Sequence, residues 1–377
     1  MKSFPIKMPW NGRDIPHGII EVNQRCNISC DGCYKNKFGY EKPLKQIKEE
    51  VDFLSSKRNL ASITIAGGEP TLYQQLPEVI SYISFKGIRP IILTNGTLLN
   101  NQRLEEYKKA GVARIAIHID KHQNKRPDAT KVTKESELNN LRKKYIELCD
   151  KKEINTVLQL TIYKDNLEDL YDVIKLGEKL PDSFNAILIT LYSDLVDNNE
   201  KFKDLSITNK EIYQFMENKE NAFPTYYVPS SHNEKSFRWL FYNSFITIDK
   251  DNEVNKLYFD PKNKFILNSF IKLPKIIKGR YSFEDPRNQK QNYVALLLYG
   301  LFSFSFSTFF KSMKFYYKSL KNKNLKVNSI LFQQGPKYLG NGEYETCKNC
   351  PDATVRNGKI IPVCLVDQIE PIKNENN

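Results

Sequence analysis

The chain has 377 residues, of which 40% are hydrophobic and 27% charged, and this composition excludes an intrinsically disordered protein. Seven cysteines and a start without a long apolar stretch favour a cytoplasmic protein whose cysteines bind metal or stay reduced. The net charge of +13 comes almost entirely from residues 261–330, which hold 14 Lys and Arg residues against two acidic ones. Such a local positive charge attracts nucleic acid, anionic lipid or an acidic partner.

Short β-branched segments alternate with helical patterns over the first half of the chain. Strands are predicted at residues 18–22, 62–66, 89–94, 114–119, 155–161 and 186–190. Helices are predicted at residues 44–54, 75–85 and 135–152. This alternation is typical of a parallel sheet, and six units are too few for an eight-stranded barrel. The sequence therefore predicts an α/β fold, a partial TIM-like (βα)6 barrel whose site lies at the carboxyl ends of the strands.

The rest of the chain is expected to extend this barrel. The predicted parts are an N-terminal arm (1–15), the partial barrel (16–195), a variable, basic and amphipathic insert (196–340), an auxiliary cysteine module (341–370) and a disordered tail (371–377). Within the insert, residues 245–248 and 254–259 are predicted to form a hairpin. The C-terminal extension is therefore expected to carry a second metal site.

Three cysteines follow directly on the first predicted strand. Cys26, Cys30 and Cys33 are spaced as Cys-x3-Cys-x2-Cys in a loop. Thiolates are the usual protein ligands of a [4Fe–4S] cluster, whereas a closed zinc site requires four ligands. Neither a histidine nor a fourth cysteine is nearby in the sequence. The three residues are therefore predicted to hold an iron–sulfur cluster and to be catalytic.

Residues 26–34 resemble the cluster loop of the radical S-adenosylmethionine (SAM) superfamily. The resemblance implies that SAM binds the fourth iron, and that its reductive cleavage yields a 5′-deoxyadenosyl radical. The family usually has an aromatic residue before the third cysteine, but here that position is Gly32 and the aromatic residue is Tyr34. The glycine variant is similar to a branch that includes a hopanoid-modifying adenosyl transferase.

Further residues match the family's cofactor loops at the ends of the predicted strands. The cofactor-binding residues that the resemblance implies are Tyr34, Gly67, Gly68, Glu69, Pro70, Asn95, His118 and Asp120. Gly-Gly-Glu-Pro resembles the family's loop for the methionine amino group, although taken alone it is also an ordinary turn. A histidine at the position of His118 is more often structural than a proton carrier. Residues 118–127 and 138–142 resemble an uncharacterised radical SAM subfamily.

A second cysteine group lies near the C-terminus. Cys347, Cys350 and Cys364 resemble the twitch-like auxiliary-cluster module of the molybdenum-cofactor cyclase family, which implies a second [4Fe–4S] cluster. Zinc is the alternative, with Asp352 or Asp367 as the fourth ligand. The resemblance to the cyclase covers only the cysteine spacing, so molybdenum-cofactor synthesis is not predicted.

Residues 298–321 are predicted to form a single amphipathic helix. The expected apolar face consists of Leu298, Phe302, Phe306, Phe309, Met313, Tyr316 and Leu320. The expected polar face consists of Ser303, Ser307, Lys311, Lys314, Lys318 and Lys321. A helix of this kind either lies in a membrane interface or packs its apolar face on its own barrel.

Together these features predict a radical SAM enzyme that modifies an unactivated carbon, by hydrogen abstraction or adenosyl addition. The leading substrate class is a lipid or isoprenoid, and the alternatives are a ribosomal peptide and RNA. A zinc-stabilised binding protein is the non-enzyme alternative, which iron and sulfide analysis would separate from the others. The expected partners are an electron donor such as flavodoxin or ferredoxin and an anionic membrane surface at the inner face. Nucleic acid is not expected, because no RNA-binding module is recognised.

Overall fold

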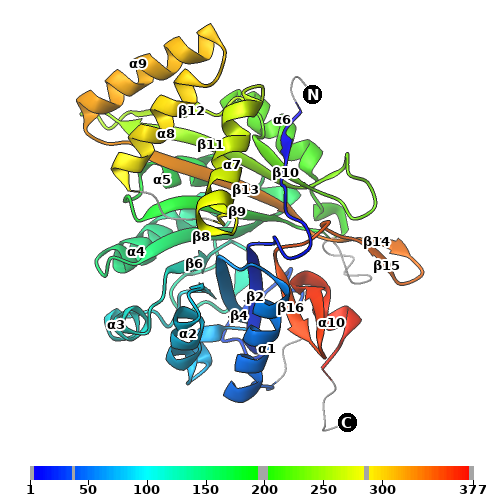
Figure 1. The fold of residues 1–377 in the computed structure, drawn as a ribbon. Coiled ribbons are helices and arrows are strands. Elements are labelled where there is room, and N and C mark those ends of the chain that lie inside the picture. Colours follow the sequence, from blue (N-terminus) through cyan, green and yellow to red (C-terminus); the bar gives the residue numbers. More distant parts are fainter. Residues whose placement is uncertain (1–3, 36–38, 194–202, 284–287, 373–377) are drawn as a thin grey trace.

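A single large sheet organises the molecule in the computed structural model, which describes residues 4–35, 39–193, 203–283 and 288–372 (Figure 1). The sheet has 11 strands and includes both parallel and antiparallel pairs. Helices cover its outer face along the first half of the chain (Figure 1). No described helix is both long enough and apolar enough to cross a membrane. Residues 373–377 of the predicted tail lie outside the described residues.

The six predicted strands are confirmed and lie side by side in chain order. They are β2 (His17–Asn23), β4 (Ser62–Gly67), β5 (Arg89–Thr94), β6 (Arg114–His118), β8 (Asn155–Ile162) and β9 (Phe184–Leu191). All five neighbouring pairs are parallel. The connecting helices are α1 (Leu44–Lys57), α2 (Leu76–Phe85), α3 (Asn101–Lys109), α4 (Asn139–Asp150) and α5 (Leu170–Lys179). The partial (βα)6 barrel is therefore confirmed, and β2 is the last strand at one end of the sheet.

The two faces of the parallel strands differ in the size of their side chains. The outer faces carry large residues such as Ile63 and Ile65, which pack against the helices in the main hydrophobic core. The inner face carries a small cluster made of Ile91, Ala116, Val157 and Ala186. Because side chains alternate along a strand, one face can fill the core while the other leaves room inside the barrel.

Residues beyond the barrel continue the same sheet. The strand β13 (Lys326–Gln334) pairs parallel with β9, and β11 (Phe237–Ile248) pairs antiparallel with β13. The predicted hairpin is confirmed as β11 and β12 (Val254–Tyr258). Outside them lie β10 (Tyr226–Pro229) and β1 (Ile6–Lys7), and α6 (Asn209–Glu220) packs on β11 and β13.

The single helix predicted at residues 298–321 is wrong. Instead α8 (Gln289–Leu301) and α9 (Phe306–Asn322) form a helical hairpin beside α7 (Lys264–Lys278) (Figure 1). Between them Phe304 has a φ of 52°, which no helix interior accepts, and the Ser305 hydroxyl caps α9 by accepting from the amide of Thr308. Serines break the helix here because their hydroxyls compete for backbone groups.

The predicted faces of this segment are also wrong. The buried positions of α9 are Ser312, Phe315 and Ser319. Ser312 packs so tightly on Gly300 of α8 that a Cβ at Gly300 would lie 2.9 Å from it. Small residues let the two helices approach closely, so the large aromatic side chains of the turn point outward instead. Phe306, on the predicted apolar face, is 87% exposed, so that face does not pack inward at this position.

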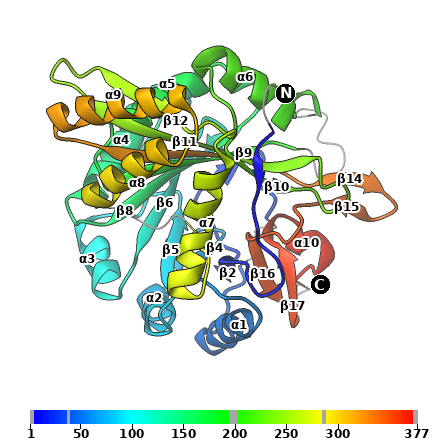
Figure 2. The same cartoon turned by 45° about the horizontal axis from the view of Figure 1, so that its top comes forward.

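The C-terminal residues cover the edge of the barrel next to β2. This module contains β14 (Lys337–Gly340), β15 (Glu343–Glu345), β16 (Ala353–Arg356), β17 (Lys359–Pro362) and α10 (Val366–Ile369). The strand β16 packs against β2 and α1. Figure 2 shows β16, β17 and α10 beside β2, so the second cysteine group is carried to the barrel by long-range packing.

Candidate functional site

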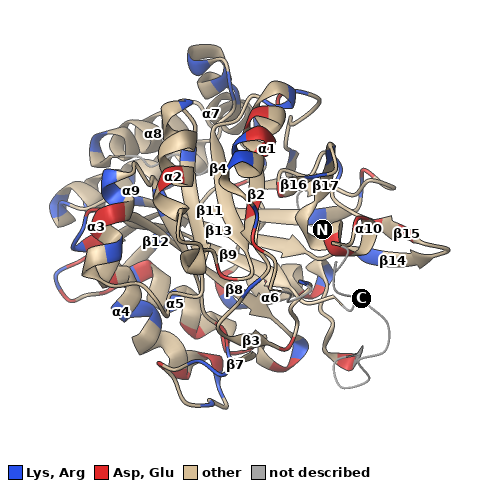
Figure 3. Cartoon of the chain, turned by 90° about the horizontal axis from the view of Figure 1, so that it is seen from below, with Lys and Arg blue, Asp and Glu red and all other residues tan. Residues whose placement is uncertain are grey.

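The first cysteine group lies where the sequence placed it, at the carboxyl end of β2. A two-residue strand, β3 (Ser29–Cys30), pairs with β7 (Gln123–Asn124) and ties the loop to the segment after β6 (Figure 3). The Asp31 carboxylate accepts from the Asn124 side chain at 2.8 Å, which fixes the loop further. Cys26, Cys30 and Cys33 line one cavity of about 180 Å³.

The paired glycines after β4 allow two stretches of backbone to meet. Gly67 has a φ of 145°, and a Cβ there would lie 2.3 Å from the carbonyl oxygen of Asn23. A Cβ on Gly68 would lie 2.1 Å from the carbonyl oxygen of Arg25. The amide of Gly68 donates to the Asn23 carbonyl at 3.0 Å, and that of Glu69 to the Arg25 carbonyl at 2.7 Å. These glycines therefore pack the loop against the cysteine loop, and both line the cavity.

The Glu69 carboxylate accepts several hydrogen bonds that hold this loop in place. Its Oε1 accepts from the amide and hydroxyl of Thr71 and from the hydroxyl of Thr94, and its Oε2 accepts from the amide of Asn95 at 2.8 Å. Burial raises the pKa of Glu69, while these donors act in the opposite direction. A carboxylate has about four acceptor sites, so Oε2 keeps capacity for a cationic amine from the cavity. Pro70 begins the short turn Pro70–Leu72 and is not among the cavity-lining residues.

The predicted residues at the ends of β5 and β6 also line the cavity. Asn95 donates to the side chain of Asn27 in the cysteine loop at 2.8 Å. His118 Nε2 lies 2.9 Å from Asp120 Oδ2. Burial favours the neutral acid, but the contact with His118 and the amide of Thr161 hold the pKa of Asp120 below its usual value. An ionised Asp120 can accept hydroxyl donors from a ligand.

Two tyrosines that the sequence did not single out complete the cavity. Tyr163 and Tyr192 stack with ring centroids 4.6 Å apart, and both line the cavity with Gly32. A Cβ on Gly32 would lie 2.4 Å from the Tyr163 hydroxyl. These rings occupy the space that a side chain at Gly32 would need, which is a physical reason for glycine at that position. Only the folded chain brings them together, because Tyr163 and Tyr192 follow different strands.

The C-terminal cysteines meet inside the barrel. Cys347, Cys350 and Cys364 line a second cavity of about 120 Å³ together with Asp352. Burial and the nearby groups of Cys347 and Asp352 raise the pKa of Cys364 to about 12. A bound cation or cluster displaces such thiol protons, because thiolates are the ligands. Asp367, the other acid considered for zinc, does not line this cavity and pairs with Arg356 at 2.6 Å.

A shared wall separates the two cysteine groups. Tyr34 lines both cavities, and burial together with the thiols of Cys364 and Cys33 raises its pKa. Beside it the buried Lys35 pairs with Glu21 of β2, which also pairs with Arg356 at 2.6 Å. These ion pairs fasten the C-terminal module to the first cysteine loop. Among the described residues, no three His, Cys, Asp or Glu side chains converge as a single-ion site requires.

The chain is similar in sequence to known proteins. A family model described as the radical SAM superfamily matches residues 20–177. Fe-coproporphyrin III synthase of Methanosarcina barkeri is 29% identical over 175 residues, or 44% of this chain and 42% of that protein. GTP 3′,8-cyclase of Clostridium botulinum is 28% identical over 243 residues, or 56% of this chain and 73% of that protein.

The chain spans 42% and 38% of the length of the first two curated relatives, the second of them a probable GTP 3′,8-cyclase of Methanococcus maripaludis that is 31% identical. Among solved structures, Streptococcus suis SuiB bound to S-adenosylmethionine matches with a TM-score of 0.41 and 14% identity. That match covers 55% of this chain and 49% of SuiB.

Proposed function

We propose that this chain, whose residues 20–177 match the model of the radical SAM superfamily, cleaves SAM reductively to modify an unactivated carbon. The observation that carries the proposal is the cavity that gathers the three loop thiols, Glu69 and Asp120 at the carboxyl ends of the strands. When bound by three cysteines, a [4Fe–4S] cluster supplies the electron that converts SAM into methionine and a 5′-deoxyadenosyl radical.

The residues around the cavity fit SAM. The loop thiols supply the soft ligands that an iron–sulfur cluster prefers. Glu69 Oε2 can accept from the methionine amino group, and Asp120 from a ribose hydroxyl. The stacked Tyr163 and Tyr192 offer an aromatic surface to an adenine ring.

We expect the substitution Glu69→Gln to weaken SAM binding by about tenfold or more, since a hydrogen bond to a charged group contributes roughly 1.5–3 kcal/mol. Equilibrium binding of SAM without reductant measures this effect. Burial raises the pKa of Glu69, so the wild-type affinity should fall as the pH drops through values above the usual pKa of glutamate. The variant should lack this pH dependence.

The exposed Glu49 on α1 offers a matched control, because Glu49→Gln changes the same charge away from the cavity. An equal loss of SAM affinity in both variants would contradict a direct contact between Glu69 and SAM. A loss of SAM affinity in Glu69→Gln that is explained by a lower melting temperature would assign Glu69 a structural role.

The second group of cysteines is proposed to hold a second cluster that faces the substrate. The three thiols line one cavity together with Asp352, and thiolates are the usual protein ligands of such clusters. Their common cavity adjoins the cavity proposed for SAM, and Cys364 lies in the wall that the two share.

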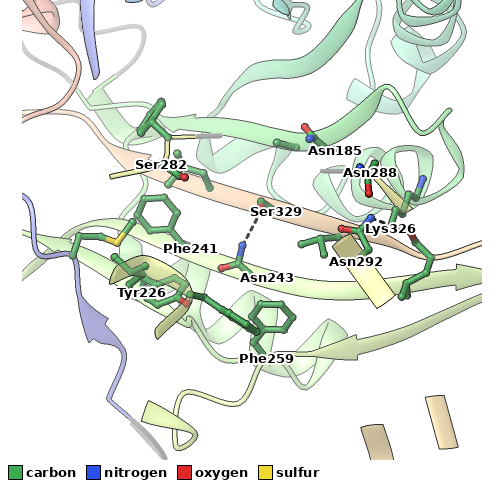
Figure 4. Close-up of a pocket in the computed structure, with 18 of the residues that line it drawn as sticks. Asn185, Tyr226, Phe241, Asn243, Phe259, Ser282, Asn288, Asn292, Lys326 and Ser329 are labelled. Carbon is green, nitrogen blue, oxygen red and sulfur yellow. Dashed lines mark hydrogen bonds between the residues drawn. The ribbon is translucent and has the colours of Figure 1, made fainter. Parts of the chain in front are cut away.

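A lipid or isoprenoid is the proposed substrate, because the interior beyond the SAM cavity is largely apolar. The cavity of the C-terminal cysteines, which we call the middle cavity, is also lined by Ile19, Ile91, Leu93, Ala116, Val157 and Leu188. Phe283 lines this cavity and also a third one of about 300 Å³ farther along the barrel. In the third cavity Tyr226, Phe241 and Phe259 lie opposite a row of amide side chains (Figure 4). A chain with one apolar and one polar part suits such a lining.

Blocking the middle cavity tests this assignment. The substitution Ala116→Phe should leave SAM binding within about twofold and lower modification of a membrane-lipid extract by about tenfold or more, since the ring fills space that substrate needs. Mass spectrometry of the extract after incubation with reconstituted enzyme, SAM and dithionite measures the product. Ala116→Ser is the control of unchanged size. If products form instead from the aqueous metabolite or peptide fraction, the lipid assignment is wrong.

A further inference from the structure

The outward side of α7, of the end of α8 and of the start of α9 is unusually apolar. We call it the α7–α9 face, and it consists of Phe265, Leu273, Ile276, Ile277, Leu297, Leu301, Phe302, Phe304, Phe306 and Phe310. Each of these side chains is exposed, Phe306 by 87% and both Ile276 and Phe304 by 77%. Contiguous apolar surface of this kind marks an interaction site on a folded protein.

Contacts between the helices make the face continuous. The ring of Phe265 at the start of α7 lies 6.4 Å from that of Phe302 and 5.4 Å from that of Phe304. Phe306 and Phe310 follow one turn apart at the start of α9. The aromatic residues of the α8–α9 turn and the start of α7 therefore form one cluster.

The outward position of these residues is a consequence of what the helices bury. The inner sides of α7 and α8 already supply a hydrophobic core through Ile266, Leu267, Leu296 and Tyr299. A helix that is apolar on its outer side as well as its inner side has a second partner. Phe304 is held outward by a left-handed backbone conformation, with a φ of 52°, that is rare for a bulky residue.

The charge on these helices indicates what that partner is. The three helices contain nine lysines and no acidic residue. Figure 3 shows the basic residues of α7 and α9. Lys264, Lys272, Lys314 and Lys321 are exposed, and the last two lie on the outer side of α9 with Phe306 and Phe310. Lysines interspersed with exposed phenylalanines are complementary to anionic headgroups above an apolar layer.

We propose that the α7–α9 face docks on an anionic membrane. The phenylalanines of the α8–α9 turn enter the headgroup boundary, and the surrounding lysines contact the headgroups. The inner sides of α7 and α8 line the 300 Å³ cavity through Phe270, Ile271 and Asn292. Docking therefore brings the wall of that cavity to the membrane surface. The docking itself does not depend on the proposed reaction, so it can be tested without SAM.

Sedimentation of the full chain with vesicles tests the proposal. The probes are vesicles of phosphatidylcholine alone and vesicles with phosphatidylglycerol added. The chain should sediment with the anionic vesicles in 0.05 M salt and bind at least about tenfold more weakly in 0.5 M salt, because the Debye length falls from more than 10 Å to a few Å. Binding to neutral vesicles should be weaker and should not depend on salt.

Two sets of variants separate the charged from the apolar contribution. Lys264→Gln, Lys272→Gln, Lys314→Gln and Lys321→Gln together should remove the preference for anionic vesicles. The matched control carries the same change at exposed lysines of α1 and α3, namely Lys45, Lys57, Lys108 and Lys109, and should keep the preference.

Phe304→Ser, Phe306→Ser and Phe310→Ser together should weaken binding to both kinds of vesicle by about tenfold or more. Phe85→Ser on α2 is the control, because Phe85 is 88% exposed but lies outside the face. All the altered side chains are exposed, so the variants should unfold at the wild-type temperature.

Absence of sedimentation with anionic vesicles at low salt would overturn the proposal, as would equal losses in the control variants. A dimer in analytical ultracentrifugation that the three Phe→Ser changes dissociate would show that a second copy of this chain covers the face instead.

Discussion

Replacing Cys26, Cys30 and Cys33 together by alanine should abolish formation of 5′-deoxyadenosine from SAM. The three thiols line one cavity on a loop whose backbone is tied to β7 and to the Gly-Gly-Glu loop. Without thiolate ligands the cluster does not form. The source of the electron that breaks the sulfonium C–S bond is then missing. The rate should fall by at least about 100-fold, which corresponds to roughly 2.7 kcal/mol of lost transition-state stabilisation.

Chromatography of the anaerobic reaction with dithionite measures this loss. Cys149→Ala is the matched control, because Cys149 is a buried thiol of α4 whose pKa burial raises to about 12. That variant should keep the wild-type rate. Persistent SAM cleavage in the triple variant would show that another part of the chain holds the reactive cluster.

The C-terminal cysteines should keep about four irons per chain in that same triple variant, the content of one [4Fe–4S] cluster. Cys347, Cys350 and Cys364 line a cavity to which Cys26, Cys30 and Cys33 do not contribute. Arg58 of the barrel donates to the carbonyl oxygens of Cys350 and Pro351 at 3.1 Å. The site should therefore form while the first loop is empty of metal.

Metal and sulfide analysis after anaerobic reconstitution measures the effect. Adding Cys347→Ala, Cys350→Ala and Cys364→Ala to the triple variant should remove the remaining iron. Stoichiometric zinc without sulfide would contradict the cluster and support a structural zinc site with Asp352 as the fourth ligand.

Much of the fold could be predicted because its signals are local. Each parallel strand is a short β-branched run, and each connecting helix repeats apolar residues at helical spacing, so neither depends on distant contacts. The spacing of Cys26, Cys30 and Cys33 within eight residues is equally local. For the same reason the hairpin β11–β12 was predictable from the turn residues between its strands.

The helical hairpin could not be predicted in this way. An apolar and serine-rich run at residues 298–310 is compatible with one long helix, and only the packing of Ser312 on Gly300 decides which side faces inward. The lysine surplus was visible in the composition, and Phe302 and Phe306 were assigned to an apolar face that could pack inward or lie in a membrane interface. Only the structure shows that both side chains are exposed. Tertiary contacts determine which apolar residues remain exposed, since a periodic pattern does not say which side has a partner.

The amino-acid sequence by itself indicated the proposed class of chemistry, because Cys26, Cys30 and Cys33 lie within one short segment. The tertiary structure alone decided the surroundings of that loop. It brought Tyr163 and Tyr192 against Gly32, and it joined Glu21, Lys35, Arg356 and Asp367 into one buried network. It also placed Cys364 in the wall of the SAM cavity, 331 positions after Cys33. Contacts over such separations arise when whole helices and strands pack together, and no periodic pattern of residues in the sequence indicates them.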